Sequence, residues 1–246
     1  MDTDEQRAAQ LDPWVMYLVV RSDLDRTPAE VLLAAAEATA RVVDELSDTD
    51  AHRAAFSEWS ARSFRKVSVR AKGKQWERLL REHCACSPSA AALGFAREEP
   101  LVCALVPRKR SANDAFLRGL QVYNPTDLGP VEPTLTHEIK IDDDARDAMV
   151  FALNPAVAMS LGKSVAQVGH AVLMCATSAF ARERPALVER WAERGYPCEI
   201  LPREPAVWQR AKSAPGSITV RDAGLTEVTP GSETVRAAFR SQWPRE

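Results

Sequence analysis

The chain has 246 residues, enough for one large domain or two small ones. Apolar residues make up 46% of it and charged residues 27%, which favours a soluble globule with a packed core over an intrinsically disordered chain. A formal net charge of −2 argues against an indiscriminate nucleic-acid binder, because affinity for phosphates comes largely from Lys and Arg, although a local basic face remains compatible with it.

The hydrophobic pattern and the cysteines indicate a cytoplasmic protein. No run of about 18 apolar residues is present, and the first residues are acidic and polar, so neither a membrane span nor a signal peptide is expected. The five cysteines lack the spacing of a disulfide framework and are expected to be reduced. The stretch His83-Cys84-Ala85-Cys86 could suggest a metal site, but no second ligand pair follows, so we expect no metal and no cofactor.

The first half of the chain alternates between strand and helix patterns. Residues 14–20 are apolar and rich in β-branched and aromatic side chains, which is typical of a buried strand. Thr27 and Pro28 are typical of a helix start, and an Ala/Leu/Val-rich run continues to Val43. The further expected elements are a loop and a helix within 44–63, a strand at 66–70, a helix at 74–82, a strand at 101–106 and a helix at 113–120.

The second half repeats this order after a break in composition. Residues 124–133 contain three prolines and a glycine, and an acidic run follows at 142–144, which is typical of a domain boundary. Beyond it, strands are expected at 149–153, 198–201 and 218–220, and helices at 164–180, 184–195 and 206–212.

A constant offset between the halves indicates an internal repeat. Tyr17 matches Val150, and Trp76-Glu-Arg78 matches Trp208-Gln-Arg210, at an offset of 132–133 residues. The sequence therefore predicts an α/β protein made of two tandem copies of a small module, a mixed sheet flanked by helices. The expected boundaries are a first copy at 1–125, a Pro-rich and acidic linker at 126–146 and a second copy at 147–246.

Residues 159–171 carry the first candidate site, where a strand leads into a helix. Gly162 permits a sharp turn, and Ser164 stands where an N-cap is favoured. The free N–H groups of the first helical turn, with Lys163 beside them, suit an anion or a developing oxyanion. Lys163, Gln167 and His170 follow at i, i+4 and i+7, a polar stripe on an Ala/Val-rich helix. On spacing alone, a solvated cation at a helix start remains an alternative for Lys163.

Residues 220–235 carry the second candidate site. Asp222-Ala-Gly224 is typical of a turn that leaves a strand, and residues 230–232 of a tight turn between strands. The alternation at 226–228 predicts a strand between these turns, with Thr226 on one face, and Thr234 lies just past the second turn. A carboxylate and hydroxyls at neighbouring strand ends are a usual place for an active site. The alternative is that Asp222 merely caps a turn.

Together, these two segments resemble the type II peptidyl-tRNA hydrolase family. The family patterns G-K-x-x-A-Q-x-x-H-A and D-A-G-x-T-x-x-x-P-G-S-x-T match G-K-S-V-A-Q-V-G-H-A at 162–171 and D-A-G-L-T-E-V-T-P-G-S-E-T at 222–234. The resemblance covers residues 148–240 and extends more faintly to the first half through V-V-R-S-D-L at 19–24. It implies hydrolysis of the ester that joins a peptide to the 3′ end of tRNA.

The two halves depart from the family pattern in complementary ways. The first half keeps Arg21 and Asp23 of an Arg-x-Asp pattern but lacks the other site residues. The second half keeps those residues but has Asn154-Pro155 in place of Arg-x-Asp. Because members of the family commonly act as homodimers, the resemblance implies an intramolecular pseudo-dimer with one active half.

The resemblance also implies roles for the site residues. Asp222 would orient or deprotonate the attacking water, and Lys163 would hold the oxyanion or the terminal phosphate. Thr226 and Thr234 would position water or ribose hydroxyls. Gln167 completes the candidate set, and His170 is either a proton shuttle or a structural histidine.

Binding of tRNA would need basic residues, and these are dense between 62 and 81, where eight basic residues stand against one acidic residue. Such residues also serve solubility alone. The candidates for RNA binding are Arg65, Lys66, Arg70, Lys72, Lys74, Arg108, Lys109 and Arg110. Two alternatives stay open: a non-catalytic RNA- or protein-binding module on the same fold, and an esterase acting on another aminoacyl-tRNA or acyl ester.

Overall fold

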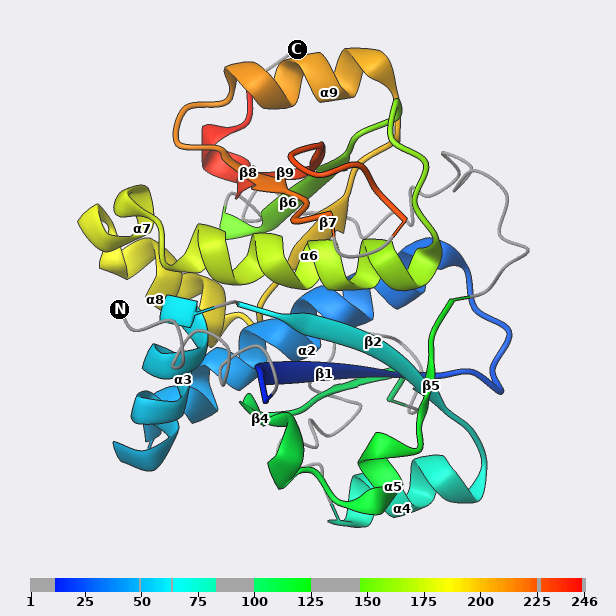
Figure 1. The fold of residues 1–246 in the computed structure, drawn as a ribbon. Helices are drawn as coiled ribbons and strands as arrows, with labels where there is room; N and C mark the ends of the chain where they lie inside the picture. The colour runs from blue at the N-terminus through cyan, green and yellow to red at the C-terminus, as the bar shows by residue number, and fades with distance from the viewer. Residues whose placement is uncertain are drawn as a thin grey trace.

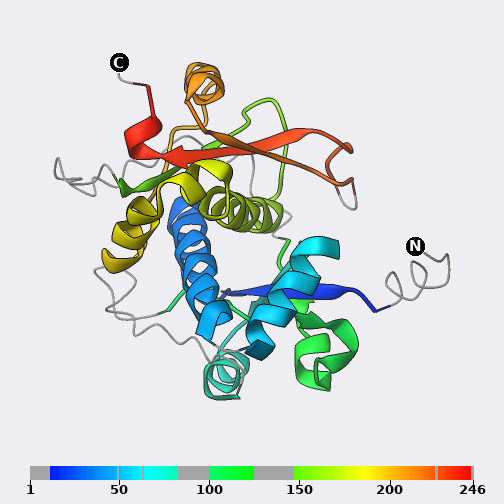
Figure 2. The ribbon, with the colours of Figure 1, turned by 90° about the vertical axis from the view of Figure 1, so that its left-hand side faces the viewer.

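Two mixed β-sheets, one from each half of the chain, face each other across a layer of two long helices (Figure 1). The computed structural model describes residues 12–48, 50–62, 64–82, 100–124, 147–224 and 227–244. A view turned by 90° shows the same order of layers (Figure 2). The predicted α/β class with a mixed sheet in each half is confirmed, whereas the predicted linker 126–146 and the stretch 83–86 lie outside the described residues.

The first sheet is built on one long buried strand. Its strands are β1 (Trp14–Arg21), β2 (Lys66–Ala71), β3 (Val102–Ala104), β4 (Arg108–Lys109) and β5 (Gln121–Val122), and its helices are α2 (Pro28–Asp48), α3 (Asp50–Arg62), α4 (Lys74–Glu82), η2 (Arg110–Ala112) and α5 (Ala115–Arg118). β1 is parallel to β2 and antiparallel to β3, in the order β3-β1-β2-β5. Met16 and Leu18 point into the central core, and Val15 and Tyr17 point outward into a second cluster with side chains of α4 and α5.

The second sheet has the order β7-β6-β9-β8. Its strands are β6 (Met149–Leu153), β7 (Cys198–Ile200), β8 (Ile218–Arg221) and β9 (Glu233–Phe239), and its helices are α6 (Leu161–Ala176), α7 (Ala179–Glu183), α8 (Pro185–Glu193), α9 (Pro205–Ser213) and η4 (Arg240–Gln242). β6 is parallel to β7, and β9 runs antiparallel to both β6 and β8. The carboxyl ends of β6, β7 and β8, the start of β9 and the start of α6 therefore share one edge.

The two long helices begin with side-chain caps. α2 starts at Thr27 and Pro28 as the sequence predicts, and there the Thr27 hydroxyl and the Glu30 carboxylate form a reciprocal capping box. α6 begins at Leu161, with Ser160 as its N-cap accepting from Lys163 N. The predicted cap at Ser164 is wrong, because this residue lies one turn inside the helix and its hydroxyl donates to Ser160 O.

The same local structure recurs in both copies. Trp59 and Trp191, which lie 132 residues apart, each donate an indole N–H to the backbone carbonyl six residues later, at 3.0 Å in both cases. Five residues after each tryptophan stands an aromatic residue with positive φ, Phe64 at 51° and Tyr196 at 62°. This recurrence supports the predicted internal repeat in three dimensions.

Each long helix packs on the other copy as well as on its own. α2 lies against α6, α6 also contacts β2, and α2 also contacts β7. We call these contacts the α6–β2 junction and the α2–β7 junction. Lys66 and Cys198 hold the same register in the equivalent strands β2 and β7. Lys66 meets His170 of α6, whereas the pKa of the Cys198 thiol is raised first by burial and then by the charge of Glu37 of α2.

The segment Leu161–Glu183, which includes α6, is long and apolar enough to cross a membrane by length and composition alone. In the folded protein, α6 is the core helix between the two sheets (Figure 1). Its apolar composition is therefore explained by the burial of most of its side chains between the sheets.

Two further expectations differ from the structure. Glu227 and Val228 lie in the loop between β8 and β9 rather than in a strand, and Thr226 lies outside the described residues.

Cys103 is disulfide-bonded, contrary to the expected reduced state. Cys175 and Cys198 are free and buried, and burial raises the pKa of the Cys175 thiol to about 12.

Candidate active site

Four of the six predicted catalytic residues meet at the shared edge of the second sheet. Lys163 and Gln167 come from the first two turns of α6, Asp222 follows β8, and Thr234 stands near the start of β9. The carboxylate and the hydroxyl thus come from neighbouring strands, as predicted, and the helix brings the other two groups to them.

Asp222 is the centre of this group and is 4% exposed. Its Oδ2 forms an ion pair with Lys163 Nζ and accepts from Gln167 Nε2 at 2.6 Å. Its Oδ1 accepts from Gly224 N at 2.7 Å. A carboxylate offers about four lone-pair positions, so these three contacts leave one for a water molecule.

The Gln167 side chain connects Asp222 to Thr234. Its amide nitrogen donates to Asp222, so its Oε1, 3.0 Å from Thr234 Oγ1, accepts from that hydroxyl. The same hydroxyl lies 3.1 Å from the Val220 carbonyl. Thr234 and Gln167 are 0% and 4% exposed, so this chain of hydrogen bonds is shielded from bulk water and holds each group in one orientation.

The two ends of the segment between β8 and β9 are hydrogen-bonded to each other at Asp222, which aims this side chain at α6. Asp222 N donates to Ser232 O at 2.9 Å, and Gly231 N donates to Asp222 O at 2.7 Å. Gly224 has φ +74°, and a Cβ there would lie 2.2 Å from the Pro230 ring. Glycine is therefore required at this position by both backbone conformation and space.

Sequence reasoning missed the residue that ties this loop to the helix. Glu227 Oε1 accepts from Ser160 N at 2.8 Å, at the N-cap of α6. A carboxylate beside a helix start is favoured by the helix dipole. The signal available in the sequence was the acidic residue five positions after Asp222.

His170 lies apart from Asp222, in the α6–β2 junction. Its Nδ1 is 3.1 Å from Lys66 Nζ, and its ring stacks on Phe64 with centroids 6.1 Å apart. Burial, with the nearby charges of Lys66 and Lys163, holds the pKa of His170 well below its ordinary value. Of the two roles considered for His170, this placement favours the structural one.

Lys66 does not belong to an exposed basic face, and its burial argues against the predicted contact with RNA. It is 8% exposed, and its ammonium lies 4.6 Å from the Trp59 ring centroid and 4.4 Å from that of Phe64. Burial lowers its pKa well below the ordinary value. β2 turns this side chain toward α6, a partner that the sequence of the first half cannot reveal.

The other basic candidates divide between the two ends of the first sheet. Arg70, Lys72 and Lys74 are exposed at the end of β2 or just beyond it. Arg108, Lys109 and Arg110 lie at the opposite end, where β4 pairs with the start of β1, and Arg65 is half-buried just before β2.

The first copy has no counterpart of the Lys163 cation. At the 133-residue offset, Lys163 corresponds to Glu30, whose carboxylate accepts from Thr27 N at 2.9 Å. The first turn of α2 is thus capped by its own side chains. Among the described residues, no group of three or more His, Cys, Asp or Glu side chains is placed to hold a metal ion.

These features define the class of protein: an α/β enzyme that sets a buried carboxylate beside a lysine at a helix start, a combination suited to hydrolysis of a negatively charged substrate. The family follows from comparison. The chain belongs to the peptidyl-tRNA hydrolase PTH2 family, whose model matches residues 14–87 and 148–239. Two matched regions in one chain confirm the predicted tandem arrangement.

A curated relative supports the same assignment. A peptidyl-tRNA hydrolase from Pyrobaculum aerophilum is 36% identical to this chain over 95 residues, a stretch that covers 35% of this chain and 78% of the relative.

Proposed function

We propose that this protein hydrolyses the ester bond between a peptide and tRNA at the Lys163–Asp222 site of the second copy, which frees the tRNA for reuse. The observation that carries the proposal is the connected group of Lys163, Asp222, Gln167 and Thr234, at a site where the chain belongs to the peptidyl-tRNA hydrolase PTH2 family. Both alternatives, a non-catalytic binder and an esterase with another substrate, make different predictions in the assay below.

We infer a step for each group from this geometry. The remaining lone pair of Asp222 accepts a proton from water as the water oxygen attacks the ester carbonyl. The bond between the carbonyl carbon and the ribose oxygen of the tRNA then breaks, and the departing oxygen takes up this proton. Lys163, 13% exposed in its side chain and beside the positive end of α6, stabilises the oxyanion or the terminal phosphate. Gln167 and Thr234 fix the orientation of the carboxylate, and Thr226 remains a candidate for holding water or a ribose hydroxyl.

We propose further that the two copies act as an intramolecular pseudo-dimer in which the first copy supports the site of the second. Ser68 Oγ of β2 donates to Gly162 O at 2.8 Å, in the first turn of α6. A Cβ on Gly162 would lie 1.5 Å from Tyr123 O, so the first copy touches the helix beside Lys163. The cytoplasm, where tRNA is used, is the proposed location.

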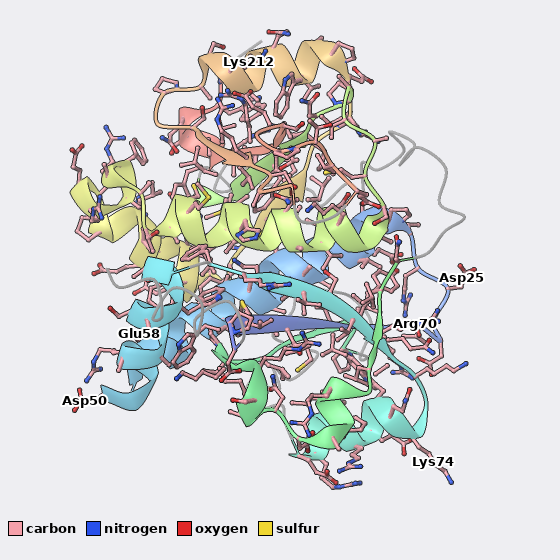
Figure 3. All side chains as sticks on the ribbon, viewed as in Figure 1. Asp25, Asp50, Glu58, Arg70, Lys74 and Lys212 are labelled. Carbon is pink, nitrogen blue, oxygen red and sulfur yellow. The ribbon has the colours of Figure 1, made fainter. Side chains whose placement is uncertain are left out.

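The end of β2 is the proposed grip for tRNA. Ser68 and Arg70 point to the same face of β2, so Arg70 lies roughly 7 Å beyond the contact with Gly162. Figure 3 shows Arg70 and Lys74 at the end of the first sheet where α6 also starts, with Lys74 farther from that helix than Arg70. Arg65, Arg108, Lys109 and Arg110 remain candidates for a second contact at greater distance from the site.

One assay separates the three functions. Wild-type protein is incubated with N-acetyl-aminoacyl-tRNA and with free aminoacyl-tRNA, and release of the acyl group is measured. A gel-shift assay in parallel measures binding of each tRNA. We expect hydrolysis of the first substrate and its loss, by at least about 100-fold, in Lys163→Ala and in Asp222→Ala. Lys212→Ala and Asp25→Ala, at exposed positions, serve as matched controls.

The other outcomes are equally informative. Unchanged turnover in both site variants would sink the residue assignment. A gel shift without hydrolysis of either substrate would identify a binder, and hydrolysis of free aminoacyl-tRNA alone would identify an esterase of different specificity.

A further inference from the structure

In the first copy, a side chain ties together the loops that follow the two parallel strands. Asp23 Oδ2, in the loop after β1, accepts from Gly73 N, in the loop after β2, at 3.1 Å. Arg21 pairs with the same carboxylate group at 3.1 Å. At the 133-residue offset, Ala156 stands in place of Asp23 and Asn154 in place of Arg21. The second copy therefore lacks the side chains that make this link.

The second copy makes the link from the opposite side. Arg203, in the loop after β7, donates from Nε to Asn154 O at 3.2 Å and from Nη2 to Val157 O at 2.6 Å. One guanidinium thus binds both carbonyls at the ends of the turn at 154–157. The turn leads from β6 to Ser160, the N-cap of α6. A planar fork of donors suits two carbonyls in a way that a lysine ammonium does not.

The turn that Arg203 holds also anchors the start of β9. Asn154 N donates to Thr234 O at 2.9 Å, and Asn154 Nδ2 donates to Glu233 O at 2.7 Å. The Thr234 hydroxyl then meets Gln167, which in turn holds Asp222. An unbroken series of hydrogen bonds therefore runs from Arg203 through Asn154 and Thr234 to the carboxylate.

We propose that Arg203 is a positioning residue of the hydrolytic site, which fixes the 154–157 turn and, through Asn154, the orientation of Thr234, Gln167 and Asp222. The proposal rests on the proposed function of this site. Arg203 follows β7 and Asp222 follows β8, and these strands are three places apart in the sheet, or roughly 14 Å. Arg203 therefore acts through the network rather than on the reacting atoms.

The test compares Arg203→Ala and Arg203→Lys with Arg182→Ala, a matched control at an exposed position of α7. Turnover of N-acetyl-aminoacyl-tRNA is measured as kcat and KM, together with the unfolding midpoint. We expect kcat of Arg203→Ala to fall about tenfold to 100-fold with KM nearly unchanged, because small displacements of catalytic groups cost this much. Arg203→Lys should recover part of the loss, and added ethylguanidinium should raise kcat of the alanine variant only.

A folded Arg203→Ala variant with wild-type kcat, or a loss of kcat that ethylguanidinium does not reverse, overturns the positioning role. If wild-type protein itself fails to hydrolyse the substrate, the proposed function fails. Amide hydrogen exchange then tests separately whether Arg203 holds the 154–157 turn. In that case Arg203→Ala, and not Arg182→Ala, should accelerate exchange at Asn154 and Ala156 by about tenfold or more, because their amides donate within the network that Arg203 holds. Unchanged exchange refutes the role.

Discussion

At the scale of single residues, identity within a motif does not determine what a side chain does. Gln167 and His170 belong to one helical stripe and to one family pattern, yet Gln167 bonds Asp222 and His170 faces Lys66 of the other copy. The difference arises because Asp222, at the rim of the second sheet, meets the second turn of α6 at Gln167, whereas Lys66 of β2 meets the next turn at His170. Catalytic assignment therefore has to follow contacts.

His170→Gln tests this distinction. We expect kcat within about threefold of wild type, because the Gln oxygen can accept from Lys66 as Nδ1 does, and no proton transfer at the ester is lost. The measurement is turnover of N-acetyl-aminoacyl-tRNA, with Asp222→Ala as the inactive reference. A loss of several hundredfold in a folded variant would restore the proton-shuttle role.

Several residue-level features were predictable and others were not. The sequence predicted that Lys163, Asp222 and Thr234 would converge, because two motifs and a strand–helix order constrain them. The burial of Lys66 depends on α6 of the other copy, which lies about a hundred positions away. The sequence predicts the N-cap of α6 at Ser164 rather than at Ser160, because both serines are acceptable caps and only burial of the intervening Leu161 separates them.

At the scale of elements, each long helix is a structural unit of both copies. α2 and α6 contact each other, and each touches a strand of the opposite sheet, β7 for α2 and β2 for α6. The sequence predicted most strands and helices, because hydrophobic runs and caps are local signals. The recurring Trp59 and Trp191 structure was also available in the sequence as a 132-residue offset, but its meaning depends on hydrogen bonds to distant backbone.

The α2–β7 junction should make stability depend on pH. Burial raises the pKa of Glu37 to about 7 from the ordinary 4.5, against the opposing effect of Arg41, and Cys198 faces the same carboxyl group. The folded protein therefore binds the Glu37 proton more tightly than the unfolded chain does. This proton adds on the order of 3 kcal/mol to the free energy of unfolding below about pH 4.5, and the added stability is lost as the pH rises to about 7.

Chemical unfolding at a series of pH values checks this. As the pH rises from 4.5 to 7, the free energy of unfolding of wild type should fall relative to that of Glu37→Gln, because glutamine does not ionise. Glu193→Gln, at an exposed position, is the control. A difference between Glu37→Gln and wild type that does not change with pH contradicts the assignment.

At the scale of the whole molecule, a nearly neutral net charge hides an uneven distribution. Three exposed cations at the end of β2 lie toward the start of α6, and three others lie at the far end of the sheet. Local fields rather than net charge attract a polyanion at close range, because salt screens exposed charges beyond about 10 Å.

Two triple variants remove the same charge at different distances from the site. We expect Arg70→Ala/Lys72→Ala/Lys74→Ala to raise KM for N-acetyl-aminoacyl-tRNA and to reduce the salt dependence of binding, by roughly 0.7–0.9 in slope for each lost phosphate contact. Arg108→Ala/Lys109→Ala/Arg110→Ala should have a smaller effect on both. Equal effects would indicate that the far end of the sheet also contacts the RNA.

The two junctions between the copies occupy equivalent positions but have different chemistry, with lysine and histidine in one and cysteine and glutamate in the other. In a symmetric homodimer, every substitution appears twice, and both junctions must change together. Fusion of the copies into one chain removes that restriction, so each junction can be mutated and selected separately. Association of the copies also becomes independent of protein concentration, so activity per molecule should survive dilution that would separate an unlinked dimer.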